Sequence, residues 1–329
     1  MSDLIDQFLA RQKTKAESDS YDLSEHTYDS YLTSCRAFRD FMDEHNIESV
    51  TEVDERDIDD FVELFLVDRV SGSTVRIYYT SLRPLFHFLE RRGHYDEDQS
   101  NPMEEVSLSD YNIDTSSSKR EKEEPIYLEP EEKDALVENV HRPKIRNKLI
   151  INLLWSTGMR ASGAVGIKIE DIDRDDRSIF LPAARNKSDQ DRTVWYDDKT
   201  AFLMDQWLDG GYRDSFPRSD GSPYLLVSRK SDQLLSRSLN RMVKQSAENA
   251  GLQSTQEIRG KEYAKITSHV LRHSYGVQKA RSGMPIKQLA MLMGHSDTST
   301  TEKYMRLAKR DLRKAAKEHQ EDISIDSTP

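Results

Sequence analysis

Cysteine is nearly absent from this sequence of 329 residues, and its apolar stretches are short. A single cysteine, Cys35, excludes an intrachain disulfide, which is typical of a protein of the reducing cytoplasm. No apolar run approaches the roughly 18 to 20 residues needed to span a bilayer. The polar, acidic N-terminus MSDLIDQFLARQ does not read as a signal peptide. We therefore expect a cytoplasmic protein with no membrane partner.

The motifs of several enzyme classes are also missing. The sequence contains no Walker P-loop, dinucleotide fingerprint, H-E-x-x-H, paired C-x-x-C or G-x-S-x-G. The net charge of −11 at first argues against nucleic acid as a partner. However, residues 1–105 hold 11 Lys and Arg against 25 Asp and Glu, whereas the remainder holds 37 against 34. The total charge therefore does not decide whether one face is basic.

The first hundred residues show the periodicity of helices. Apolar side chains recur at three- and four-residue intervals across residues 27–43 and again across 57–67. Ser73 is expected to cap a third helix that Gly93 ends. Pro84 is expected to kink or split that helix.

Arg76 and Arg83 lie seven residues apart and so share one face of the third helix. They are candidates for contacts with DNA phosphates, and an ordinary solvated helix face is an equal alternative. Residues 107–125, SLSDYNIDTSSSKREKEEP, have the composition of a linker. The predicted organisation is a helical domain (1–106), the linker (107–125), a second domain (126–319) and a tail (320–329).

The second domain is expected to be mostly α with a small β-sheet, an α+β fold. Residues 147–156 are apolar nearly all round, which predicts a buried helix stopped by Gly158. SIFLPA and RTVWY read as two strands flanking a polar hairpin tip, ARNKSDQD. Ser299 and Glu302 form a capping box for the last helix. The remaining helices are predicted over residues 236–250, 270–282, 286–293 and 300–318.

Four separate segments supply candidate functional groups. SHVLRHSYG places a histidine and an arginine three residues apart, so they share a helix face. GHSDTSTTEKY holds a histidine and a tyrosine nine residues apart, with the tyrosine in the second turn of the last helix. Another arginine follows Gly158, and a lysine sits at the hairpin tip. The six candidates are Arg160, Lys187, His269, Arg272, His295 and Tyr304.

This combination of groups suits attack on a phosphodiester without a metal or other cofactor. A phenol with a pKa near 10 is ionised in only about one molecule in a thousand at pH 7, so its site must activate it. Two guanidiniums can hold the charge that builds on the non-bridging oxygens. A lysine can protonate the departing 5′ oxygen.

The motifs TGMR (157–160), HxxR (269–272), LMGHS (292–296) and the tyrosine nine residues beyond that histidine resemble the tyrosine recombinase, or phage integrase, family. The resemblance covers the whole chain and includes the Xer-type recombinases. It implies a helical core-binding domain followed by a catalytic domain. It also implies a site-specific recombinase acting on double-stranded DNA as a homotetramer, by strand exchange through a Holliday junction.

Residue by residue, the resemblance implies that Arg160 and Arg272 grip the scissile phosphate and that Lys187 is the general acid. His269 would assist proton transfer, and His295 would hydrogen-bond a phosphate oxygen. Tyr304 would form a covalent 3′-phosphotyrosine and leave a free 5′-hydroxyl.

One position departs from the family pattern. Three residues after the first arginine the family usually places an acidic residue, and this sequence has Gly163. The absence of that carboxylate is expected to lower activity, unless another carboxylate such as Glu170 or Asp171 replaces it.

Each candidate also has a structural interpretation. Arg160 alone equally suits a salt bridge at a helix end, and Lys187 alone a solvated loop, with Lys168 and Arg185 as other candidates for its role. His273 is assigned a structural role.

Two other functions remain open from the sequence. A type IB topoisomerase uses similar chemistry to relax supercoils, and a catalytically weak DNA-binding protein on the recombinase fold is the other alternative.

Overall fold

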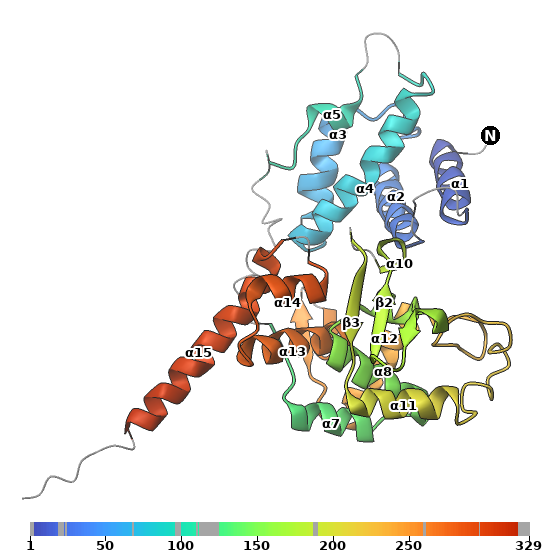
Figure 1. Cartoon of the computed structure of the whole chain (residues 1–329). Helices are drawn as coiled ribbons and strands as arrows, with labels where there is room; N and C mark the ends of the chain where they lie inside the picture. Colours follow the sequence, from blue (N-terminus) through green and yellow to red (C-terminus); the bar gives the residue numbers. More distant parts are fainter. Residues whose placement is uncertain are drawn as a thin grey trace, which may run out of the picture. The chain divides into compact units, whose positions relative to one another are not determined.

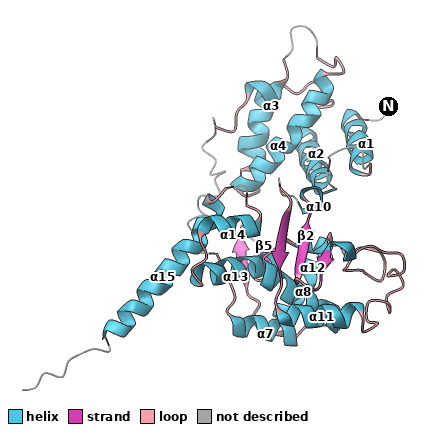
Figure 2. Cartoon of the chain, in the orientation of Figure 1, coloured by secondary structure: helices cyan, strands magenta, loops and turns pink. Residues whose placement is uncertain are grey.

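The computed structural model describes most of the chain as two compact units, Met1–Lys122 and Glu123–Pro329, each with its own hydrophobic core. Helices make up most of both units, and every strand among the described residues lies in the second (Figure 2). The predicted mostly α fold with a small sheet is therefore confirmed. The residues described are 3–18, 23, 25–67, 69–95, 100–109, 111, 125–186, 190–258, 261–295 and 297–321.

The N-terminal unit is a helical bundle around aromatic side chains. Its rings pack edge to face, as where Phe38 meets Phe61 with centroids 4.9 Å apart, a favourable arrangement of aromatic quadrupoles. Its elements are α1 (Leu4–Ala16), α2 (Glu25–His45), α3 (Glu55–Asp60), a π-helix (Phe61–Leu66), α4 (Gly72–Glu90) and α5 (Pro102–Glu105).

The predicted helix over residues 57–67 is wrong in its start and its form. Asp54 and Asp57 make a capping box that starts α3 at Glu55, because each side chain accepts from the other's backbone N–H. From Phe61 the chain continues as a π-helix, closed by Val67 N donating to the Val62 carbonyl at 3.3 Å.

The third predicted helix also differs in detail. Ser71, not Ser73, caps α4, because the Ser71 side chain accepts from Thr74 N. Pro84 lies inside α4 and does not split it. The helix ends at Glu90, shortly before Gly93.

One residue of the predicted linker belongs to the core of the first unit. Tyr111 is 9% exposed and donates its hydroxyl proton to Asp59. Residue 110 and residues 112–124 of the predicted linker lie outside the described residues.

The second unit is built around α8 (Lys144–Thr157), which packs against helices on several sides (Figure 1). Leu149 to Leu154 are all buried, which confirms the predicted buried helix, and Gly158 ends it. The other helices are α7 (Pro130–Glu138), α9 (Ala161–Val165), a 3-10 turn (Ile169–Asp171), α10 (Ala183–Asn186), α11 (Asp198–Leu208), α12 (Ser236–Asn249), α13 (Ser268–Arg281), α14 (Ile286–Met293) and α15 (Ser299–Glu321).

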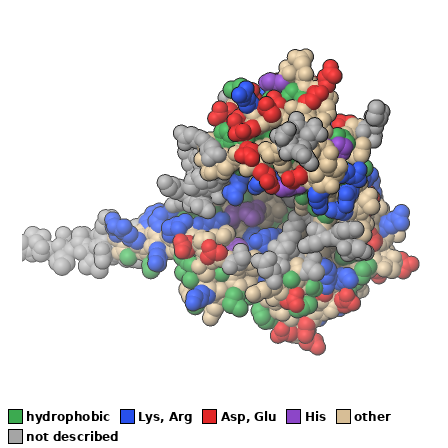
Figure 3. Space-filling view, turned by 90° about the horizontal axis from the view of Figure 1, so that it is seen from above, with side chains coloured by type: hydrophobic (Ala, Val, Ile, Leu, Met, Phe, Trp, Pro, Cys, Tyr) green, Lys and Arg blue, Asp and Glu red, His purple; other side chains and the backbone are tan. Residues whose placement is uncertain are grey.

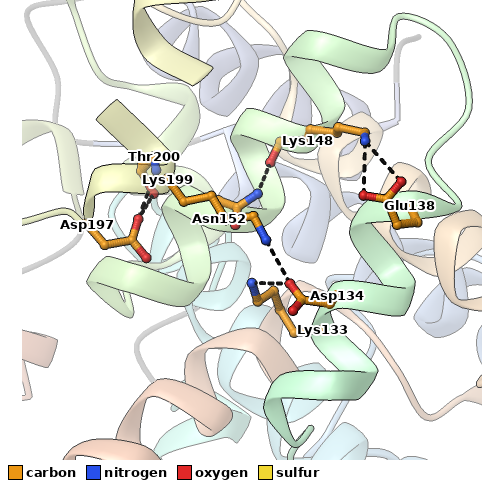
Figure 4. Close-up of polar contacts among 8 residues, drawn as sticks. All are labelled: Lys133, Asp134, Glu138, Lys148, Asn152, Asp197, Lys199 and Thr200. Carbon is orange, nitrogen blue, oxygen red and sulfur yellow. Dashed lines mark hydrogen bonds and ion pairs between the residues drawn. The ribbon is translucent and has the colours of Figure 1, made fainter. Parts of the chain in front are cut away.

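Polar contacts join α8 to its neighbours α7 and α11. Asp134 accepts from Lys133 Nζ at 2.7 Å and from Lys199 Nζ at 2.9 Å, so one carboxylate links α7 to α11 (Figure 4). Lys148 of α8 pairs with Glu138 of α7. These contacts hold the side of the unit that carries no candidate catalytic residue.

Two small antiparallel sheets complete the unit. β1 (Ile172–Asp173), β2 (Ser178–Leu181) and β3 (Arg192–Trp195) form the first, with Ile179 opposite Val194. The predicted hairpin strands are β2 and β3, but its tip is not wholly loop, since α10 follows β2. β1 and the second sheet, β4 (Thr255–Ile258) with β5 (Lys261–Ala264), were not predicted.

The last three helices pack on one another and fix the position of Tyr304. α13, α14 and α15 share a cluster that includes Tyr275, Leu289, Met293 and Tyr304 (Figure 1). Arg281 of α13 strengthens this packing, because its guanidinium pairs with Asp311 of α15 and with Glu129.

The predicted capping box at the last helix is wrong. Ser299 is the first residue of α15, and Asp297 accepts from both its backbone N–H and its hydroxyl. From Leu312 to Lys317 the helix is exposed, and Lys and Arg side chains lie along it (Figure 3). The tail from 322 onward lies outside the described residues. No helix among the described residues is both long enough and apolar enough to cross a membrane.

Candidate active site

The C-terminal ends of two helices orient the predicted arginines. Arg272 of α13 is 2% exposed, and it donates to the Gly158 carbonyl at 2.7 Å and to the Met293 carbonyl at 2.6 Å. Arg160, which precedes α9, donates to the Gly294 carbonyl at 3.3 Å. The last carbonyls of α8 and α14 carry partial negative charge, which favours a cation there. A guanidinium has five donors, so these bonds leave others for an anion.

The turn at Gly294 brings a third arginine to the same place. Gly294 closes α14 with φ +64°, and a Cβ there would lie 1.9 Å from Arg192 Nη1. Burial and the charge of Arg160 lower the pKa of Arg192 to about 10. Sequence reasoning used Arg192 only to locate Lys187. A basic residue opening a strand beside the hairpin tip was the signal that could have found it.

His295 is held so that one ring nitrogen faces the protein. Its Nδ1 lies 2.8 Å from Thr301 Oγ1, and Thr301 is fully buried. In the tautomer that accepts from this hydroxyl, the proton lies on Nε2, where it can be donated to a phosphate oxygen. The position suits the role predicted for His295.

Tyr304 is buried at the centre of the site. It is 1% exposed, and its Oη lies 2.7 Å from His273 Nδ1. Burial raises the pKa of Tyr304 to about 12, although Arg272 and Arg160 act to lower it. The phenol therefore keeps its proton at neutral pH. Sequence reasoning missed this role of His273, because 31 residues separate the two partners.

The five candidates that the structure describes influence one another electrostatically. Burial lowers the pKa of Arg272 to about 9, and the nearby Arg160 adds to the effect. Desolvation by the surrounding protein, together with the charge of Arg272, lowers the pKa of His269 to about 4 and that of His295 to about 3, although part of the His269 side chain stays exposed. The structure thus brings Arg160, His269, Arg272, His295 and Tyr304 into one electropositive site.

A cleft of about 790 Å³ opens onto this site within the second unit. Arg160, Arg192 and His295 line it together with Lys287. Asp191 also lines the cleft, so an anion that enters it meets three cationic side chains, one imidazole and one carboxylate.

The predicted general acid lies outside the described residues. Lys187 follows α10, of which the structure describes the backbone through Asn186. Arg185 of this helix forms a bidentate ion pair with Asp171. Its Nη1 donates to Oδ2 at 2.7 Å and its Nη2 donates to Oδ1 at 2.6 Å. The ion pair fixes the base of the segment that carries Lys187.

The position of the missing acidic residue is filled by helix packing. Gly163 is buried in α9. The two carboxylates considered as replacements have other partners in the structure. Asp171 is bound by Arg185, and Glu170 pairs with Lys168 at 3.5 Å. The contact that the structure gives Arg160 is its hydrogen bond to the Gly294 carbonyl at 3.3 Å.

The N-terminal unit holds two further groups of polar side chains. Arg76 and Arg83 are both exposed on α4, so either can reach a phosphate or simply face solvent. Among the described residues, His87, Glu90 and Glu104 are grouped closely enough to hold a metal ion. The two carboxylates are exposed, and none of the predicted chemistry involves them.

Protein stability is expected to fall as the pH drops below about 6.5. The pKa of His273 is lowered to about 2 and that of His295 to about 3, chiefly by burial. In the unfolded chain both titrate near 6.5, so below that pH the unfolded state binds more protons. Each histidine then lowers the free energy of unfolding by up to about 1.4 kcal/mol for each unit by which the pH falls. Urea unfolding at pH 7.5, 6.5 and 5.5 measures the slope, and a flat profile would contradict it.

Comparison with known proteins gives the family. The phage integrase family matches residues 127–311, and the N-terminal SAM-like domain of phage integrases matches residues 19–93. The chain therefore belongs to the phage integrase family, the tyrosine recombinases, which are enzymes that cleave and rejoin DNA.

Individual relatives agree with this assignment. The tyrosine recombinase XerC of Roseiflexus sp. (strain RS-1) is 26% identical over 310 residues, covering 92% of this chain and 89% of that protein. The tyrosine recombinase XerA of Pyrococcus furiosus is 32% identical over 194 residues, covering 58% and 60%. Among solved structures, the XerH site-specific recombinase bound to palindromic difH substrate has the same fold. Its TM-score is 0.68 at 21% identity, covering 95% of this chain and 84% of that one.

Proposed function

We propose that this chain is a site-specific recombinase in which Tyr304 attacks the DNA backbone. The observation that carries the proposal is the convergence of Tyr304 with Arg160, Arg272 and His295 through the packing of α13, α14 and α15. No metal or cofactor takes part in the proposed reaction.

The reaction begins when Tyr304 Oη attacks the phosphorus of one phosphodiester. A bond forms from Oη to phosphorus, and the bond to the 5′ oxygen breaks, which leaves a 3′-phosphotyrosine and a 5′-hydroxyl. Arg160 and Arg272 stabilise the charge on the non-bridging oxygens, and the Nε2 proton of His295 binds one of them. His269 assists proton transfer, and Lys187 protonates the leaving 5′ oxygen.

The partner is double-stranded DNA, on which four copies of the chain pair their breaks and exchange strands through a Holliday junction. Residues 1–106 form the core-binding domain, in which Arg76 and Arg83 contact phosphates. Residues 107–125 form the linker, residues 126–319 the catalytic domain and residues 320–329 the tail. The enzyme works in the cytoplasm.

Recombination is favoured over relaxation alone, because the relatives named above are recombinases. Recombination and relaxation are distinguished by incubating the protein with a plasmid that carries two copies of the target site. That site is first found by incubating the protein with nicked genomic fragments and sequencing the DNA left on Tyr304.

A recombinase is expected to delete or invert the segment between the two copies. Relaxation without exchange would identify a type IB topoisomerase activity. Binding without any covalent adduct would identify a DNA-binding protein on the recombinase fold.

A further inference from the structure

The nucleophile proposed above has a partner that the HxxR motif does not contain. His273, directly after Arg272, places Nδ1 2.7 Å from Tyr304 Oη. The motif histidine, His269, lies one turn earlier on α13 and is exposed, with its ring edge-on to that of His273 at 4.4 Å between centroids. His273 therefore contacts the reacting oxygen directly, and His269 lies behind it.

The fold fixes this contact from two sides. Gly276 lies one turn beyond His273, where a Cβ would come within 2.7 Å of the Tyr304 ring. The ring thus packs flush against α13, and the hydroxyl meets the imidazole. Packing between α13 and α15, with the ion pair of Arg281 and Asp311, holds the two helices together.

We infer that His273 accepts the phenolic proton of Tyr304 as its oxygen attacks the phosphate, an assignment that rests on the proposed function. The bond from Oη to phosphorus forms while the proton passes from Oη to Nδ1. The bond from phosphorus to the 5′ oxygen breaks, and that oxygen takes a proton from Lys187. When the strand is rejoined, the 5′-hydroxyl returns its proton to Lys187 and the departing phenolate takes its proton from His273.

The surrounding charges make this transfer depend on DNA. The groups that face His273 are His269 and Arg272 on its own helix, Lys303 on α15 and His295 after α14. Together with burial they disfavour the imidazolium, which lowers the pKa of His273 in the free protein. A bound phosphate brings negative charge that offsets the positive charges of Arg272 and Lys303. His273 is therefore a base that works only when the substrate is present.

The test compares replacements of His273 in single-turnover cleavage of a nicked duplex that carries the target site. His273→Asn keeps a hydrogen-bond acceptor near the position of Nδ1 but cannot take a proton, and His273→Phe removes both. Both are expected to cleave about 10²- to 10⁴-fold more slowly at pH 7, the usual loss for a general base. DNA binding and urea unfolding show whether each variant is folded.

The pH dependence separates proton transfer from mere support of the phenol. Without His273 the phenol must ionise unaided, so the rate of His273→Asn should rise about tenfold per pH unit between 7 and 9. The wild-type rate should rise much less over this range. A substrate with sulfur in place of the bridging 5′ oxygen should not rescue His273→Asn, because the leaving group is not the defect.

His269→Asn is the matched control on the same helix, and it should lack the steep pH dependence. If His273→Asn cleaves as fast as the wild type, or shares its pH profile, hydrogen bonding suffices and the inference is overturned. If the wild-type protein forms no adduct with Tyr304, the proposed function fails and the inference falls with it. A normal wild-type adduct with an unaffected His273→Asn overturns the inference alone.

Discussion

Tyr304→Phe is expected to bind DNA normally and to form no covalent adduct on any substrate. The change removes only the Oη atom, and the ring keeps its packing against Gly276 and the α13–α15 cluster. The hydroxyl lost is the one bound to His273, so the reaction loses its nucleophile. The measurement is denaturing electrophoresis of protein incubated with a labelled, nicked duplex.

Tyr275→Phe provides the matched control. Tyr275 is also buried in the cluster of α13, α14 and α15, and burial likewise raises its pKa to about 12. It should therefore form the adduct at the wild-type level. A covalent adduct of Tyr304→Phe would show that another residue is the nucleophile.

Lys187→Ala is expected to cleave about 10²- to 10⁴-fold more slowly while binding DNA nearly as well, the usual loss of a general acid. Its defect should largely disappear when sulfur replaces the bridging 5′ oxygen, because a thiolate leaves without a proton. Arg160→Ala and Arg272→Ala should not be rescued, since they lose stabilisation of charge on the non-bridging oxygens. Single-turnover rates on paired oxygen and sulfur substrates measure the difference.

Lys168→Ala is the control for this experiment, because Lys168 lies in the same unit and pairs with Glu170. It should cleave both substrates at nearly the wild-type rate. If sulfur fails to rescue Lys187→Ala, then Lys187 is structural. If Lys168→Ala cleaves the oxygen substrate slowly and the sulfur substrate normally, Lys168 is the general acid instead.

The sequence predicted well wherever a strong local signal existed. The apolar residues 147–156 are a buried helix that ends at Gly158, and residues 286–293 are helical as expected, with Gly294 closing the helix. At such ends a glycine adopts a left-handed conformation that other residues rarely take. The family motifs also named five candidate residues that lie close together in the structure, and their catalytic roles stay a prediction.

The sequence failed where competing partners decided the outcome. Two serines, Ser71 and Ser73, lie where the helix starts, and the one that caps it in the structure is Ser71. Asp297 bonds to Ser299, so that serine does not cap the last helix. The strands at Thr255–Ile258 and Lys261–Ala264 are short and polar, so their pairing left no periodic signal.

Contacts between distant segments left no trace in sequence spacing. The pair formed by His273 and Tyr304 depends on how α13 packs against α15, and the approach of Arg192 to Gly294 depends on how α14 packs against β3. Carbonyls at helix ends likewise hold Arg160 and Arg272, and these contacts also join segments far apart in the sequence.

The central claim is that Tyr304 becomes joined to the 3′ phosphate of cleaved DNA. The most direct measurement is mass spectrometry of peptides from wild-type protein trapped on a nicked duplex and then digested with protease and nuclease. We expect a nucleotide attached through its 3′ phosphate to the peptide that contains Tyr304. Attachment to any other residue, or linkage through a 5′ phosphate, would contradict it.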